Sequence, residues 1–154
     1  MTEYTLSRIA TSIASYLEPH FPGLTFYEDP LQQSMNKPCM FIQTRGASID
    51  KRMGNRYLWT LRLDLVYLLD FNLVDLQRKY QQAAELIDYY LETFPYSDGT
   101  GSELIRTYNR DWNIDLDELH YRFELRSWVG KDELAVYMGT LETNVEVIDG
   151  SEKA

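Results

Sequence analysis

One segment of the chain, residues 57–69, constrains the fold more than any other. Every odd position in it is apolar or aromatic, from Tyr57 and Trp59 through to Leu69. Successive side chains of a strand point to opposite faces of a sheet, so this pattern predicts a long β-strand with one fully apolar face. At about 3.3 Å per residue, such a strand is longer than a small domain is wide. We therefore expect it either to bend or to project at one end toward a partner.

Two other segments have the periodicity of amphipathic helices. In residues 5–18 and 73–94, apolar side chains recur three and four positions apart, which places them on one face of a helix. Pro19 ends the first helix, and Asn72 is the predicted N-cap of the second. Each helix therefore offers an apolar stripe that can cover the sheet.

The rest of the chain is predicted to form strands and connections. Further strands are predicted at residues 24–27, 39–44, 104–112 and 119–129, with loops at 28–37, 46–55 and 95–101. Near the C-terminus the pattern fits helical turns at 134–141 or a strand at 143–147, and residues 150–154 are expected to be a disordered tail. The whole predicts the α+β class: a mainly antiparallel sheet with two main helices packed on it, in a single domain at residues 1–149.

The composition argues against several classes of protein. Fifteen Lys and Arg against 24 Asp and Glu give a net charge of −9. This is the wrong sign for binding nucleic acid, because that affinity comes from cations that displace phosphate counterions. The single cysteine, Cys39, excludes an internal disulfide framework. No apolar run approaches the ~20 residues of a membrane span, and the N-terminus does not resemble a signal peptide, so we expect an intracellular origin. Twelve Tyr and 3 Trp suit an interface as well as a core, which favours a domain that binds protein partners.

Neither the histidines nor the cysteine predict catalysis. His20 and His120 have no base or nucleophile near them in the sequence, so both are predicted to be surface or structural histidines. Cys39 lies in an apolar segment without a local acid or base, and is predicted to be a buried, inert thiol. We therefore expect neither enzyme activity nor a cofactor.

Two charged clusters have alternative interpretations. The acidic one comprises Asp111, Asp115, Asp117 and Glu118. It suits either a hard cation such as calcium or a solvated turn between strands, and the turn is favoured because the spacing fits no EF-hand loop. The basic one comprises Arg45, Lys51, Arg52, Arg56 and Arg62. It suits phosphate or an acidic partner subunit, and in a chain of this net charge the partner subunit is favoured.

The order of the segments resembles a known family. The segment Lys37-Pro38-Cys39-Met40-Phe41-Ile42 follows the opening helix and an aromatic strand, and precedes Asn55-Arg56-Tyr57 and a long strand that carries Asp64 and Tyr67. This order resembles the tail terminator proteins of phages and defective prophages of Gram-positive bacteria, including PBSX-like particles and contractile phage-tail bacteriocins. The resemblance is clearest from residue 5 to about residue 92.

The resemblance implies a structural protein of the virion. It implies an α+β subunit, made in the host cytoplasm, that forms a hexameric ring on the head-proximal end of the tail tube. The ring stops tube growth and presents the surface where the head joins. It implies no catalysis, cofactor or membrane. The expected partners are copies of the same chain and the tail tube protein, with sheath and neck proteins as further candidates, and DNA passes through without specific binding.

Two hypotheses about residues follow. The first assigns a contact with a neighbouring subunit or the tube to Lys51, Arg52, Arg56, Tyr57 and Trp59. The second assigns an acidic lining of the bore, which would repel DNA phosphates, to Asp111, Asp115, Asp117 and Glu118. Other readings stay open: another ring of the virion neck (a tail-completion or head–tail connector protein), a small intracellular regulator that binds one protein, and an enzyme that uses the acidic cluster with a metal.

Overall fold

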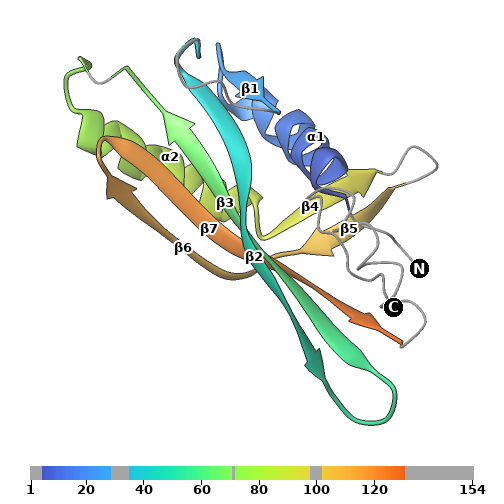
Figure 1. The fold of residues 1–154 in the computed structure, drawn as a ribbon. Coiled ribbons are helices and arrows are strands. Elements are labelled where there is room, and N and C mark those ends of the chain that lie inside the picture. Colours follow the sequence, from blue (N-terminus) through green and yellow to red (C-terminus); the bar gives the residue numbers. More distant parts are fainter. Residues whose placement is uncertain (1–4, 29–34, 71, 98–101, 131–154) are drawn as a thin grey trace, which may run out of the picture.

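A five-stranded sheet runs the length of the molecule (Figure 1). The computed structural model describes residues 5–28, 35–70, 72–97 and 102–130. The sheet has the order β1-β2-β3-β7-β6, and only the pairing of β1 with β2 is parallel. Its strands are β1 (Thr25–Tyr27), β2 (Cys39–Lys51), β3 (Tyr57–Leu68), β6 (Tyr108–Asp115) and β7 (Glu118–Val129).

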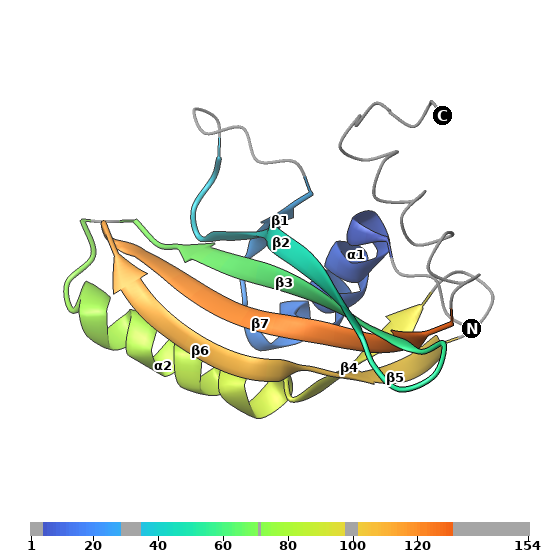
Figure 2. The same cartoon turned by 60° about the horizontal axis from the view of Figure 1, so that its bottom comes forward.

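Two helices and a small hairpin cover one face of this sheet. Helix α1 (Leu6–Leu17) begins after Thr5, whose side chain accepts a hydrogen bond from the Arg8 amide at 3.3 Å, and a 3-10 turn, Glu18–His20, follows it. Helix α2 is Leu76–Tyr90, and the hairpin consists of β4 (Thr93–Ser97) and β5 (Ser102–Arg106). Figure 2 shows α2 along one side of β6 and β7.

The core lies between the sheet and these elements. The odd-numbered residues of β3 from Trp59 to Tyr67 are all buried, and the same cluster takes in the buried faces of both helices and of the small hairpin. Burying one large apolar side chain contributes about 1.5–3 kcal/mol, so this face holds most of the stabilising apolar surface. The α+β prediction and the apolar face of the long strand are confirmed.

The predicted loop at 46–55 is wrong for residues 46–51, because β2 continues to Lys51, and only residues 52–55 of it lie in the connection to β3. The pairing passes from Thr44 opposite Leu63 to Gly46 opposite Arg62, which leaves Arg45 as the extra residue of a β-bulge. A bulge reverses the alternation, so even positions face the core before it and odd positions after it. Gly46 has φ 149°, a conformation that residues with a Cβ rarely adopt.

Other boundaries also differ from the prediction. Helix α2 begins at Leu76 with Asp75 as its N-cap, so the prediction of Asn72 is wrong. Part of the predicted loop at 95–101 is strand, since β4 continues through Pro95 to Ser97. The predicted strand at 104–112 is two strands of different sheets, separated at Thr107, whose hydroxyl donates to the Leu91 carbonyl at 2.6 Å. The predictions for residues 134–141, 143–147 and 150–154 lie outside the described residues.

The long β2–β3 hairpin projects beyond the helices (Figure 1). Its pairing continues from Cys39 opposite Leu68 to Lys51 opposite Tyr57. Strand β7 accompanies β3 along the same length, from Leu119 to Val129. Of the two alternatives expected for the long strand, bending or projection at one end, the structure shows projection.

Candidate functional site

The projecting part of the sheet, which we call the arm, has three strands: residues 46–51 of β2, 57–62 of β3 and 125–129 of β7. Strand β1 pairs with β2 only as far as Phe41, and β6 pairs with β7 only as far as Glu124. Within the described part of the chain, the β2 edge of the arm therefore lacks a strand partner. Unpaired edges are templates for pairing with another chain.

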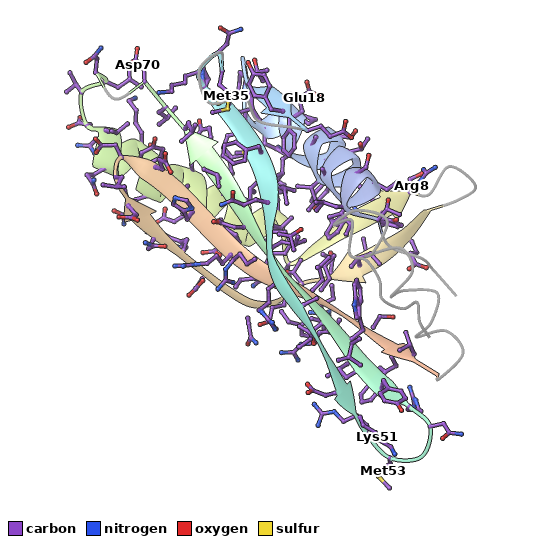
Figure 3. The ribbon with its side chains drawn as sticks, in the orientation of Figure 1. Arg8, Glu18, Met35, Lys51, Met53 and Asp70 are labelled. Atoms are coloured by element: carbon purple, nitrogen blue, oxygen red, sulfur yellow. The ribbon has the colours of Figure 1, made fainter. Side chains whose placement is uncertain are left out.

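The end of the arm, which we call the tip, consists of residues 51–56 and Trp128. Residues 51–56 include three cations, Lys51, Arg52 and Arg56, and no carboxylate, and all six residues are exposed. The Arg56 guanidinium lies 4.8 Å from the centre of the Trp128 ring, a cation–π contact. Met53 is 90% exposed (Figure 3). The tip thus combines positive charge with apolar surface, which is typical of an interaction site.

The structure separates the predicted contact residues into two groups. Lys51, Arg52 and Arg56 are exposed at the tip, and Tyr57, just behind them, is partly buried. Trp59 is 1% exposed and belongs to the core. The prediction of Trp59 as a surface contact is therefore wrong in this structure, because its position in the alternation points it toward the core.

The acidic cluster spreads along β6 and the turn that joins it to β7. Asp111 is close to Arg122, with 3.4 Å between Oδ1 and Nε, and Asp115 and Asp117 are exposed. Glu118 begins β7 and points one carboxylate oxygen at His120. Within the described ranges, no group of three or more His, Cys, Asp or Glu side chains is arranged to hold a metal ion.

A polar network on the face opposite the helices was not anticipated from the sequence. His120 Nδ1 lies 2.8 Å from Asp64 Oδ2, and His120 Nε2 lies 3.0 Å from Glu118 Oε1. Gln43 also donates to Asp64 Oδ2, at 3.2 Å. Asp64 is only 6% exposed. A carboxylate at an even position inside an apolar strand was the available signal, because a buried charge needs a partner.

The two carboxylates control the ionisation of His120. Burial lowers the pKa of His120, but the hydrogen bonds and negative charges of Asp64 and Glu118 outweigh it and raise the pKa above its ordinary value of 6.5. The prediction of a structural histidine agrees with this contact, whereas the supposed lack of a nearby acid or base is wrong.

This geometry predicts a pH dependence of stability. The folded state binds the His120 proton more tightly than the unfolded state, so the stabilisation is fully present below pH 6.5 and is lost as pH rises through the raised pKa. We expect the free energy of unfolding to decline over that window, and His120→Gln to remove this part of the decline. Denaturant titrations at a series of pH values measure it. If the free energy of unfolding declines equally steeply with pH in the two proteins, the assignment to His120 is wrong. Asp64→Asn should also make this decline less steep.

A hollow lies beside this network. Its volume is about 640 Å³, and its lining combines apolar side chains with charged ones. It is lined by Met35, Lys37, Phe41, Gln43, Val66, Leu68, Leu69, Leu116, Asp117, Glu118 and His120. The Tyr80 hydroxyl supports its edge, because it accepts from the Leu69 amide at 2.9 Å and donates to the Asp117 carbonyl at 2.7 Å. A helix thereby holds the β6–β7 turn against the end of β3.

Cys39 and His20, the other two residues considered for catalysis, both lie in packing positions. Cys39 is fully buried, and burial raises the pKa of its thiol, as expected of an unreactive cysteine. His20 stacks on Tyr90, with 3.8 Å between the ring centres.

Comparison with known proteins identifies the family. No helix within the described ranges has the length and apolar character needed to cross a membrane. No curated protein matches the chain. The family model described as Phage tail terminator protein matches residues 8–136, which include nearly every element described above. The chain therefore belongs to the phage tail terminator protein family and is a structural protein of phage tail assembly.

Proposed function

We propose that six copies of this chain form a ring that caps the head-proximal end of the tail tube, ends its growth and presents the surface where the head joins. The observation that carries the proposal is the arm: in a member of this family, it projects beyond the body with a cationic tip and with a β2 edge that has no strand partner among the described residues. These are features that a monomer leaves unused and an assembly can cover.

Charge supports a contact between the arm tip and an acidic surface. Six subunits carry 6 × −9 = −54 formal charges, which repel one another unless basic patches face acidic ones. Lys51, Arg52 and Arg56 are concentrated at the tip, while carboxylates are frequent elsewhere. We assign the contact with a neighbouring subunit or the tube to these three residues and Tyr57.

The acidic cluster is proposed to line the bore. Asp111, Asp115, Asp117 and Glu118 lie along the edge strand β6 and its turn, and an acidic wall does not bind the phosphates of passing DNA. The electron density of an assembled ring tests this. If all four side chains lie on the outer rim, the bore assignment is wrong.

The expected partners are further copies of the chain, the tail tube protein and, at the neck, sheath or connector proteins. The site of action is then the virion, at the head-proximal end of the tail.

Solution mass tests the ring directly. We expect light scattering to give a species of six times the subunit mass of 18.1 kDa, with a central hole in negative-stain images. Binding to one end of purified tail tubes, with growth of those tubes stopped, distinguishes a terminator from another ring of the neck. A monomer that neither forms a ring nor caps tubes would contradict the proposal.

A further inference from the structure

The arm tip and the hollow lie at opposite ends of the same sheet. Tyr57, next to the tip, pairs with Val129, whereas Tyr67, next to the hollow, pairs with Leu119. Tyr57 and Tyr67 are ten residues apart along β3, which corresponds to roughly 33 Å. Figure 3 shows Met53 at one end and Met35, which lines the hollow, at the other. One molecule therefore cannot place its own tip in its own hollow.

The hollow has the chemistry to receive the tip. Met35 and Phe41, which are both partly exposed, contribute apolar surface, and Asp117 and Glu118 are the carboxylates of its lining. The tip presents the matching surfaces: the exposed apolar side chain of Met53 lies between two cations in the sequence, Arg52 and Arg56. Apolar surface thus faces apolar surface while arginines face carboxylates, which is the complementarity expected of a specific interface.

The β6–β7 turn adds an independent observation. Leu116 and Asp117 form a two-residue hairpin turn with φ values of 51° and 62°. Hairpin turns of this kind favour Asn and Gly, and a left-handed conformation is unfavourable for leucine. Leu116 is also 87% exposed. Leu116 is thus a large apolar side chain in an unfavourable backbone conformation, and it is exposed to solvent. Such a residue does not stabilise the monomer, which is typical of a contact residue.

We propose that Met53 of one copy docks into the hollow of the next copy, where it packs against Leu116, while Arg52 and Arg56 pair with Asp117 and Glu118. The contact joins two different surfaces, so it is head-to-tail, and repeated with a fixed rotation it closes a ring. This inference rests on the proposed ring. It assigns Asp117 and Glu118 to the subunit contact and leaves Asp111 and Asp115 for the bore.

Cysteine pairs test the contact in the assembled full-length protein, free in solution or bound to tube ends. Met53→Cys combined with Leu116→Cys should give, on oxidation, a ladder of cross-linked species that ends at the size of the ring. The matched control combines Met53→Cys with Tyr89→Cys, because Tyr89 is 77% exposed but lies on α2, across the sheet from the hollow. The control and the single variants should give no ladder.

The outcomes distinguish this contact from the proposed ring. A ring without a ladder, or with equal ladders from both pairs, overturns the docking contact and leaves the ring intact. A cross-link from Met53→Cys to the tube protein, and none between copies, also overturns it in favour of the tube as occupant. Failure to form a ring or to cap tubes overturns both proposals.

A second variant keeps the test independent of cross-linking. Leu116→Asn relieves the left-handed strain and removes the apolar side chain. We expect the melting temperature of the unassembled protein to be unchanged or higher, and the concentration needed for half-assembly to rise about tenfold or more. Unchanged assembly would overturn the role of Leu116.

Discussion

Reversing the charge of Lys51 and Arg52 is expected to abolish assembly and leave the fold intact. Both residues are exposed at the arm tip, and neither side chain forms an ion pair in the described part of the chain. Surface substitutions of this kind usually change stability by no more than about 0.5 kcal/mol. At the proposed interface, however, Lys51→Glu with Arg52→Glu would bring carboxylates toward Asp117 and Glu118. Loss of such pairs weakens association by about 2–5 kcal/mol, which removes most of the ring at micromolar concentration.

The measurements are circular dichroism and thermal melting for the fold, light scattering for the ring, and capping of purified tail tubes. The matched control carries the same change of charge elsewhere: Arg78→Glu with Lys79→Glu, both exposed on α2. It should assemble and cap normally. Unchanged capping by the tip variant would show that the tip cations do not hold the assembly.

Trp59→Ala is expected to destabilise the fold by about 3–5 kcal/mol, because it empties a large, fully buried site in the core. Trp59 lies within the arm, opposite Ile49 and Ser127, so its loss also loosens the packing of the arm. Trp128→Ala provides the contrast, since Trp128 is 48% exposed and stacks under Arg56. It should change stability little and weaken assembly.

These two variants are compared by denaturant titration below the concentration at which the protein assembles, because assembly itself stabilises the folded state. The ordering of their free energies of unfolding is the decisive result. If Trp128→Ala proves the more destabilising, the assignment of Trp59 to the core and Trp128 to the surface is wrong.

Much of the fold was predictable because local periodicity reports which side of an element is buried. The odd positions are apolar throughout residues 57–69 and, except for Ser127, throughout 119–129, and both segments form central strands whose odd positions are mostly buried. Helix α1 was predicted for the same reason. The family resemblance, which rested on the order of such segments, is confirmed over residues 8–136.

The errors arose where local pattern and tertiary structure disagree. The bulge at Arg45 shifts the alternation of β2 by one residue. Ile42, at an even position before the bulge, and Ile49, at an odd position after it, therefore both face the core cluster. Gly46 and the polar residues that follow then resemble a loop, although pairing with β3 makes them a strand. Likewise, Pro95 predicted a turn, but in the structure it lies within strand β4 of the small hairpin.

Part of the candidate site was likewise predictable from the sequence, and part depended on the tertiary structure. The sequence alone identified the cations of the tip, because charges at 51–56 are local, and it placed four carboxylates in one short segment. Only the tertiary structure brought Asp64 beside His120, 56 positions away, and assembled the hollow from separate strands. It also turned Trp59 inward and left Trp128 exposed. The physical reason is that an alternating pattern records burial along one strand, whereas contacts between strands depend on register, which bulges and turns determine at a distance.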